Sequence, residues 1–150
     1  MNINNKTLAW IVSILVLAAV VAAFITIGGP SRQRSLRFDE RRVSDLQAIQ
    51  GQIITYWQQK NSLPASLSDL SDSISGFKAP TDPETTQAYE YSVTSSLNFQ
   101  LCATFNLPSE SDQTRAVPMM YPGPDNWSHG VGRVCFERSI DPQLYKPVKY

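Results

Sequence analysis

His129 is the only histidine of the chain and the natural starting point in a search for catalytic chemistry. Catalysis of the Ser-His-Asp or Cys-His type needs a histidine beside a nucleophile, with an acid that orients the imidazole ring. Asp125 and Cys135 are close to His129 in the sequence, but a proline-rich stretch surrounds Asp125 and defines no geometry. We therefore expect a surface histidine and no catalytic residue.

Two pairs of carboxylates, Asp69/Asp72 and Asp82/Glu84, fall in segments rich in turn-forming residues, where acidic side chains commonly cap backbone amides. The oxygen atoms of residues 78–85 offer a calcium site as an alternative, yet their spacing does not match the twelve-residue calcium loop. Tetrahedral zinc needs more ligands than two thiols and one distant imidazole. The sequence thus predicts turns, no metal site, no cofactor, and a protein that is not an enzyme.

The first 30 residues differ sharply from the rest, because no charged side chain lies between Lys6 and Arg32. The run from Leu8 to Ile27 is apolar, and a helix of that length rises about 30 Å, the thickness of the hydrocarbon core of a bilayer. Trp10, near one end, is typical of a membrane interface. We predict a transmembrane anchor within residues 1–30, with the lipid bilayer as its partner, followed by a soluble domain in residues 31–150.

A cleaved signal peptide is the alternative, with the cleavage site near Ala22 or Ala23. The apolar run is longer than the usual 7–15 residues of such a peptide. It also continues past these alanines through Phe24, Ile25 and Ile27. We therefore favour a retained anchor.

The charged residues bear on orientation and on partners. Lys6 precedes the apolar run, whereas Arg32, Arg34, Arg37, Arg41 and Arg42 follow it. The positive-inside rule then places the soluble domain in the cytoplasm. The whole chain carries 13 basic and 13 acidic residues, a balance that gives no reason to expect a nucleic-acid partner.

A second helix is expected after Gly28, Gly29 and Pro30, with Ser31 as its cap. Apolar residues recur there at steps of three and four, which indicates an amphipathic helix that packs against a sheet. Arg41 and Asp45 are spaced for an ion pair on the polar side. The arginine-rich start either contacts anionic lipid headgroups or is a solvated face that sets topology. The apolar stripe comprises Leu36, Val43, Leu46, Ile49, Ile53, Tyr56 and Trp57.

Three segments predict strands of an antiparallel sheet. Apolar and polar residues alternate in Ala88–Thr94 and Leu97–Phe105, which indicates one buried face, and Ser95 and Ser96 suit a short hairpin. A third strand fits Val131–Arg138. Before the sheet, Pro64 is placed to start a short helix. The apolar sides comprise Tyr89, Tyr91 and Val93; Leu97, Phe99, Leu101, Ala103 and Phe105; Val134 and Phe136; and, in the short helix, Leu63, Leu67 and Leu70.

Both cysteines, Cys102 and Cys135, fall on the polar faces of their predicted strands, although free cysteine is usually buried. A disulfide between neighbouring strands explains two cysteines on the outer face of one sheet. Stable disulfides belong to oxidising compartments. The cysteines therefore place the soluble domain outside the cytoplasm, against the charge rule.

The segment from Asn106 to Gly130 is too long for a simple connection, and such segments are functional or loosely ordered. Its residues Met119, Tyr121, Trp127 and His129 form a candidate surface for a protein partner. The alternative, which we favour, is that these side chains fold back on the sheet as a lid.

The order of these parts resembles type II secretion pseudopilins and type IV pilin-like proteins. In those proteins an apolar N-terminal helix also continues into an amphipathic one, followed by segments like NSLPASLSDL and APTDPETTQAYEY and then an antiparallel sheet. The stretches DPETTQAYEYSVTSSLNFQLCATF and GRVCFERSIDP also look like the soluble domain of uncharacterised bacterial membrane proteins. One departure is that pilin-like precursors carry a glycine before the apolar run and typically a glutamate within it, and both are missing here.

These observations predict an α+β protein, with a transmembrane helix and an amphipathic helix packed on a small antiparallel, pilin-like sheet. The resemblance implies a single-pass structural or binding module of the bacterial cell envelope, with its domain outside the cytoplasm and a protein partner in the membrane or envelope. The alternative is an accessory subunit of a membrane complex that faces the cytoplasm.

Overall fold

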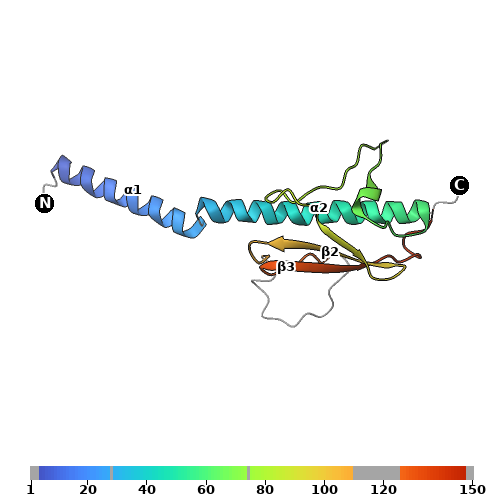
Figure 1. Cartoon of the computed structure of the whole chain (residues 1–150). Coiled ribbons are helices and arrows are strands. Elements are labelled where there is room, and N and C mark those ends of the chain that lie inside the picture. The colour runs from blue at the N-terminus through green and yellow to red at the C-terminus, as the bar shows by residue number, and fades with distance from the viewer. Residues whose placement is uncertain (1–3, 28, 74, 110–125, 148–150) are drawn as a thin grey trace, which may run out of the picture. The chain divides into compact units, whose positions relative to one another are not determined.

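The computed structural model describes residues 4–27, 29–73, 75–109 and 126–147. The fold class is α+β, as predicted, with a long apolar N-terminal helix and a three-stranded antiparallel sheet. Residues 1–35 form one compact unit and residues 36–150 a second. In chain order the elements are α1 (Asn5–Ile27), α2 (Pro30–Lys60), the short 3₁₀ helix η1 (Leu67–Leu70), β1 (Glu90–Val93), β2 (Asn98–Phe105) and β3 (Gly132–Ser139) (Figure 1).

The first helix, α1, is almost wholly apolar, and residues 6–23 are long and apolar enough to cross a membrane. Ser13 donates its hydroxyl to the carbonyl oxygen of Ala9 (2.9 Å), so its polar group has a partner within the helix. The predicted span from Leu8 to Ile27 lies inside α1. An N-terminal signal sequence has the same length and composition, so α1 is a helix suited to a bilayer as either anchor or signal.

The boundary between the two helices lies at the glycine-proline segment, as expected, but the second helix starts earlier than predicted. α2 begins at Pro30, and Arg32 donates its backbone N–H to the carbonyl oxygen of Gly29 (3.0 Å). Proline suits the first helical position because its missing N–H would have no partner there. Ser31 is therefore part of α2 and not its cap.

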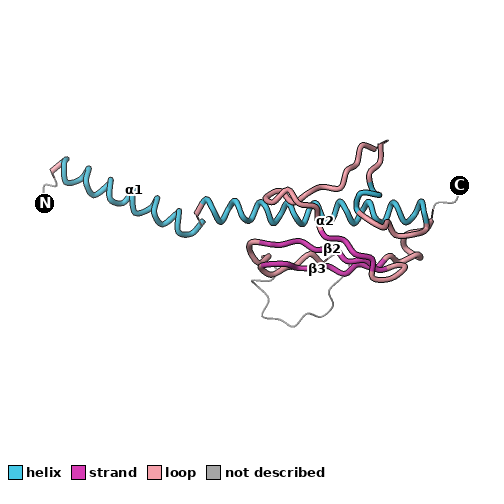
Figure 2. The backbone as a smooth tube through the Cα atoms, viewed as in Figure 1, coloured by secondary structure: helices cyan, strands magenta, loops and turns pink. Residues whose placement is uncertain are grey.

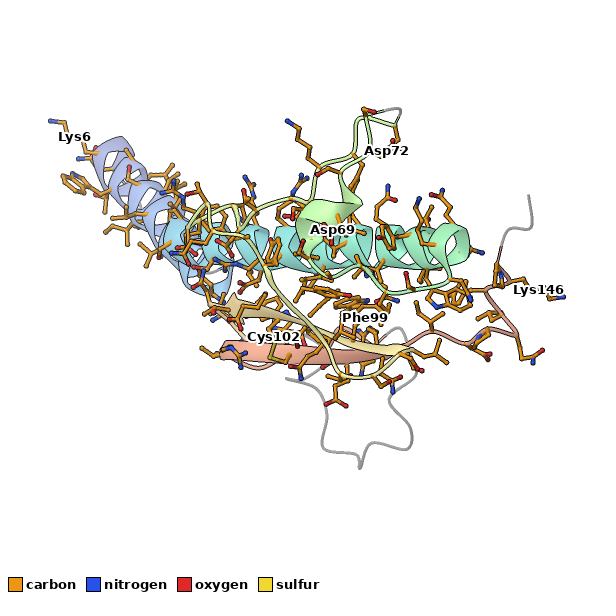
Figure 3. All side chains as sticks on the ribbon, turned by 45° about the vertical axis from the view of Figure 1, so that its right-hand side comes forward. Lys6, Asp69, Asp72, Phe99, Cys102 and Lys146 are labelled. Carbon is orange, nitrogen blue, oxygen red and sulfur yellow. A yellow bond between two sulfur atoms is a disulfide. The ribbon has the colours of Figure 1, made fainter. Side chains whose placement is uncertain are left out.

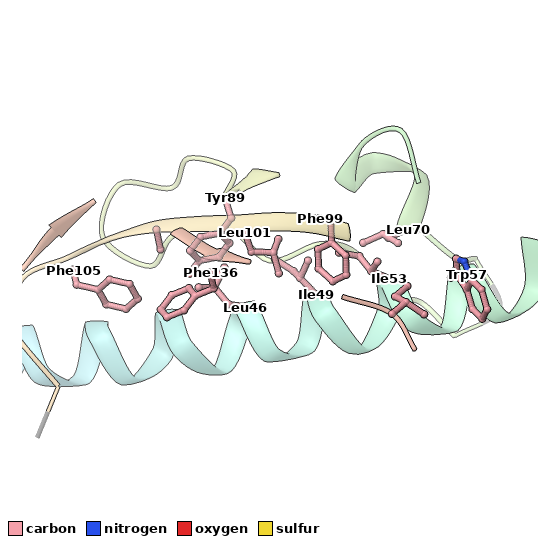
Figure 4. Packing of buried hydrophobic residues seen from close by; sticks show 12 residues of the cluster. Leu46, Ile49, Ile53, Trp57, Leu70, Tyr89, Phe99, Leu101, Phe105 and Phe136 are labelled. Atoms are coloured by element: carbon pink, nitrogen blue, oxygen red, sulfur yellow. The ribbon is translucent and has the colours of Figure 1, made fainter. Parts of the chain in front are cut away.

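A single hydrophobic core holds the second unit together between α2 and the sheet (Figure 4). Leu46, Ile49 and Ile53 are fully buried, and Trp57 is nearly so. Burying each such side chain stabilises the fold by about 1.5–3 kcal/mol. Val43 and Tyr56 of the predicted stripe are half-buried at the edge of this core. The sheet contributes Phe99, Leu101, Ala103, Phe105 and Phe136, η1 contributes Leu70, and the segments next to the strands contribute Tyr89 and Ile140.

The sheet has the order β1-β2-β3, with both pairs of neighbours antiparallel. Leu101 pairs with Tyr91 on one side and with Phe136 on the other. Alternate residues of β2 face α2, as predicted, and Phe99 lies among the side chains between helix and sheet (Figure 3). Val93 was expected on the buried face but is exposed, because it stands at the end of the short strand β1.

The predicted strands differ from the observed ones by one or two residues at their ends. β1 begins at Glu90 because Ala88 pairs instead with Thr81, across the turn that precedes the strand. Thr94 donates its backbone N–H to the carbonyl oxygen of Asn98 (2.9 Å), which closes the expected hairpin. β3 extends to Ser139, opposite Asn98.

Cys102 and Cys135 lie directly opposite each other on β2 and β3 and form a disulfide. Both belong to the face of the sheet that points away from α2. Cys102 is nevertheless buried, which the polar pattern did not predict. Arg133 covers it, with its Nη2 atom 3.6 Å from the sulfur, and Glu90 pairs with Cys102 from the other neighbouring strand.

The connection from α2 to β1 is mainly loop (Figure 2). The short helix expected near Pro64 is η1, and Pro64 itself lies before it as a fully buried residue. The hydroxyl of Tyr91 donates to the carbonyl oxygen of Pro64 (2.9 Å), which ties this loop to the sheet. Residues 81–88 form a tight turn in which Thr86 donates its N–H to the carbonyl oxygen of Asp82 (2.8 Å).

Candidate functional site

Arg42 forms an ion cluster with the buried residues Asp39 and Asp82 and with the exposed Glu84, which together we call the arginine cluster. Nη1 of Arg42 donates to Asp39 (2.8 Å), Nε donates to Asp82 (2.6 Å), and Nη2 donates to Glu84 (2.7 Å). The side chain of Arg42 is only 2% exposed. Because breaking a buried ion pair leaves an unpaired charge without water, this arrangement strongly constrains the surrounding chain.

The carboxylates of the arginine cluster also accept hydrogen bonds from backbone amides. Asp39 accepts from the amides of Asn106 and Leu107, at 3.0 and 2.8 Å. Asp82 accepts from the amides of Glu84 and Thr85, at 2.9 and 2.8 Å. The arginine cluster therefore joins three parts of the second unit, namely α2, the turn of residues 81–88 and the end of β2.

Burial and hydrogen bonding compete in setting the charges of this cluster. Burial favours the neutral form of Asp82, but hydrogen bonds from Arg42 and from two backbone amides outweigh it and lower the pKa of Asp82 to about 2. The pKa of Glu84 is lowered by hydrogen bonds from Asn106 and Arg42. Burial would lower the pKa of Arg42, yet its hydrogen bonds to the three carboxylates raise that pKa above the usual value. Arg42, Asp82 and Glu84 are therefore charged at neutral pH.

Asp45 lies on α2 about one turn after Arg42. It accepts a hydrogen bond from the hydroxyl of Tyr89 (3.0 Å) and forms an ion pair with Arg41 (3.1 Å). Burial, followed by the hydrogen bond to Asp45, raises the pKa of Tyr89 well above its usual range. The predicted Arg41–Asp45 ion pair is present, but Asp45 is buried, so the expectation that the pair lies wholly on the polar side of the helix was wrong.

A cavity of about 480 Å³ lies beside the arginine cluster, between α2 and two loop segments. Its size is within the range of small-molecule and peptide sites, and its wall mixes apolar with polar groups. The ring of Trp127 and the imidazole of His129 form part of this wall. The lining residues are Leu36, Asp39, Glu40 and Val43 of α2, Leu107, Pro108 and Ser109 after β2, and Asn126, Trp127, Ser128 and His129 before β3.

His129 is buried, so the prediction of a surface histidine was wrong. Its ring stacks on Phe105, with ring centroids 3.7 Å apart, and its Nδ1 atom lies 3.2 Å from the carbonyl oxygen of Gly130. Phe105 belongs to the apolar face of β2, which gives the imidazole a hydrophobic platform. The sequence did not reveal this because no helical or strand period relates His129 to the residues of β2.

Trp127 also turns toward the sheet. Its ring lies 4.8 Å from Phe136, and the guanidinium of Arg138 stands 4.2 Å above it. Arg138 also donates to the side chain of Gln50 and to the carbonyl oxygen of Asn126, both at 2.9 Å. Trp127 and His129 therefore lie on the core side of the sheet, as the lid alternative requires, while Met119 and Tyr121 lie outside the described residues.

Asp125 and Cys135 are the two residues near His129 in the sequence that were considered as catalytic partners. Cys135 is in the disulfide, and Asp125 lies outside the described residues, so neither is a described partner of His129. The hydroxyl of Ser109 accepts the backbone N–H of His129 (3.1 Å) and lies 3.2 Å from that of Ser128. Within the described part of the chain, no group of three acidic, histidine or cysteine side chains is placed to hold a metal ion.

Of the four acidic residues in the two pairs of the sequence, Asp69, Asp72 and Asp82 accept backbone amides, as predicted. Asp69 accepts the N–H of Ser66 (2.9 Å), and Asp72 accepts that of Ser75 (3.1 Å). Asp82 caps its turn in the same way but also binds Arg42, and Glu84 binds Arg42 and not an amide of the turn. The calcium alternative for residues 78–85 has its main carboxylates committed to this arginine.

A signal for the arginine cluster was present in the sequence. Asp39, Arg42, Leu46, Ile49 and Ile53 follow the same steps of three and four, so the buried stripe continues into polar residues. Only apolar residues were expected on the packed stripe, and Arg42 was expected either at lipid headgroups or on a solvated face. A buried charge needs an opposite charge beside it. The spacing of Asp39 and Arg42 on the buried stripe was therefore the signal in the sequence for this cluster.

Comparison with known proteins gives no further assignment. No protein-family model matches this chain, and no curated protein or solved structure matches it. Inference about its role therefore depends on its own residues and geometry.

Proposed function

We propose that this chain is a single-pass membrane protein of the bacterial cell envelope, whose second unit is a pilin-like structural or binding module outside the cytoplasm. The observation that carries this proposal is the order of the elements. A helix suited to a bilayer precedes a second helix that packs on a three-stranded antiparallel sheet. This order is also what the sequence resemblance to pseudopilins and pilin-like proteins implies.

The disulfide supports a location outside the cytoplasm. Cys102 and Cys135 are bonded across β2 and β3, and such bonds persist in oxidising compartments. The arginines after α1 favour the opposite orientation by the positive-inside rule. An accessory subunit that faces the cytoplasm is therefore the second candidate, and it requires the same two cysteines to be free thiols in the cell.

A binding or structural role accounts for the polar groups of the second unit. The charged side chains of the arginine cluster hold loops to α2, and His129 packs on Phe105. The cavity beside them is the place where a protein partner of this module would make contact. Filament assembly of the pilin type is not part of the proposal, because the apolar run contains no acidic residue.

The test combines topology with the state of the cysteines. Protease added to intact spheroplasts should digest the second unit, and alkylation without reductant should label neither Cys102 nor Cys135. Digestion only after lysis, together with two alkylated thiols, would refute the proposed orientation and establish the cytoplasmic candidate. Reduction before alkylation should add two labels and serves as the control for access to the reagent.

A further inference from the structure

The structure divides the five arginines that follow the apolar run into two groups. Arg42 is buried in the arginine cluster, and Arg41 pairs with Asp45. Arg32, Arg34 and Arg37 are exposed on the first turns of α2. The positive-inside rule counts these five arginines alike. In the structure, the three that are nearest to α1 in the chain are exposed and lie outside the Arg41–Asp45 pair.

These arginines lie close to the start of α2. Arg37 is seven residues beyond Pro30, which corresponds to about 10 Å of helix. That distance is about one Debye length at physiological salt, so a charge at the helix start is still felt there. Side chains of a helix tilt toward its N-terminus, and the long arginine side chain extends this reach toward the end that follows α1.

The beginning of α2 also favours an anion in its own right. The first turn contains no acidic residue, and the N-terminal end of a helix dipole is positive. Pro30 has no N–H, and the N–H groups of Arg32 and Gln33 already donate to the carbonyl oxygen of Gly29, so the positive charge here comes from the helix dipole and the arginines. The exposed arginines and the helix end therefore both present positive charge at the start of α2, which directly follows α1 in the chain.

We propose that Arg32, Arg34 and Arg37 bind the phosphate headgroups of anionic lipids around the anchor. The proposal rests on the proposed function, since α1 must be in the membrane to bring headgroups to α2. Arg42 takes no part, because its guanidinium is committed to three carboxylates. A basic residue near the membrane surface contributes about 1 kcal/mol, or roughly a fivefold preference for an anionic lipid.

The test measures which lipids remain bound to the full-length chain. The protein is reconstituted in vesicles of equal phosphatidylcholine and phosphatidylglycerol, released in mild detergent, and examined by native mass spectrometry. The variant Arg32→Gln/Arg37→Gln is compared with Lys60→Gln/Arg133→Gln, which removes the same charge from exposed positions elsewhere. Carbonate extraction of the vesicles before detergent reports separately on whether the chain is anchored.

We expect the wild-type chain to retain phosphatidylglycerol preferentially and the Arg32/Arg37 variant to lose at least fivefold of that preference. The Lys60/Arg133 variant should behave like the wild type. Equal retention of the two lipids by the wild type, or an equal loss in both variants, overturns the lipid proposal and leaves the anchor intact. Release of the chain by carbonate overturns the proposed function itself, and the lipid proposal with it.

Discussion

Arg42 binds three carboxylates from two separate parts of the second unit. It comes from the middle of α2, yet its partners Asp82 and Glu84 are 40 and 42 positions away in the chain. A buried guanidinium with three carboxylates is a cluster in which each member depends on the others. Its substitution should therefore affect the fold far more than a surface arginine would.

We predict that Arg42→Gln lowers the free energy of unfolding by about 3–5 kcal/mol, because buried carboxylates lose their counter-charge. The change is measured by urea unfolding of the full-length protein in detergent, followed by tryptophan fluorescence. Arg41→Gln is the matched control. The side chain of Arg41 is 66% exposed, and its buried partner Asp45 keeps the hydrogen bond from Tyr89, so a smaller loss of about 1 kcal/mol is expected. Equal losses in the two variants would contradict the assigned role of Arg42.

The lowered pKa of Asp82 predicts a stability that depends on pH. The pKa of this group is about 2 in the folded state and 3.8 in its ordinary state, so the folded protein favours the charged form. The stabilisation is complete above the ordinary pKa and is lost as the pH falls toward the folded pKa. We expect the urea midpoint to fall between about pH 4 and pH 2, with a smaller fall in Asp82→Asn. An identical acid profile in that variant would show that other groups are responsible.

At the scale of elements, the pairing of β2 with β3 brings together residues that are far apart in the chain, such as Cys102 and Cys135 with a separation of 33 positions. The register places Cys102 against Cys135 and Leu101 against Phe136, so one pair of strands carries both the disulfide and part of the core. The strands and the faces of β2 followed from alternation in the sequence. That β2 and β3 are neighbours does not follow from alternation, and in the sequence only the two cysteines indicated it.

We predict that the variant Cys102→Ser/Cys135→Ser folds but is less stable by roughly 3–4 kcal/mol, because the bond closes a loop of 33 residues. Urea unfolding of wild-type and variant proteins, both without reductant, measures this difference. Reduction of the wild-type protein should reproduce the loss, and reductant should leave the variant unchanged. A variant as stable as the oxidised wild type would mean that the bond adds nothing to the fold.

At the scale of the whole molecule, α1 decides whether the second unit remains attached to a membrane. The helix passes the length and composition test for a span, and a signal sequence passes it as well. The two alternatives differ in the mature chain, since an anchor is retained and a signal is removed.

We predict that the mature protein keeps residues 8–27 and stays in membranes during carbonate extraction. Val16→Arg should lower the membrane-bound fraction, because arginine at the centre of a span costs about 2.5–3.5 kcal/mol. Val131→Arg is the control, since Val131 is an exposed valine of the second unit. A mature mass that begins near Phe24 would identify a signal sequence and exclude the anchor.

The amino-acid sequence by itself determined the elements with regular periods. Runs of apolar residues predicted α1, the three- and four-residue steps predicted the packed face of α2, and alternation predicted the buried face of β2. These patterns are local, because each side chain's position follows from the geometry of its own helix or strand. The positions of both cysteines on the polar faces of their predicted strands likewise indicated a disulfide.

Only the tertiary structure decided which polar residues belong inside. Arg42, Asp45 and His129 were assigned to the surface, and all three are buried because partners from distant segments satisfy them. Burial of a charged or aromatic polar group depends on those partners, and the partners are brought together by chain folding over tens of residues. Local periodicity does not predict such contacts, so the arginine cluster and the cavity beside it could be identified only from the tertiary structure.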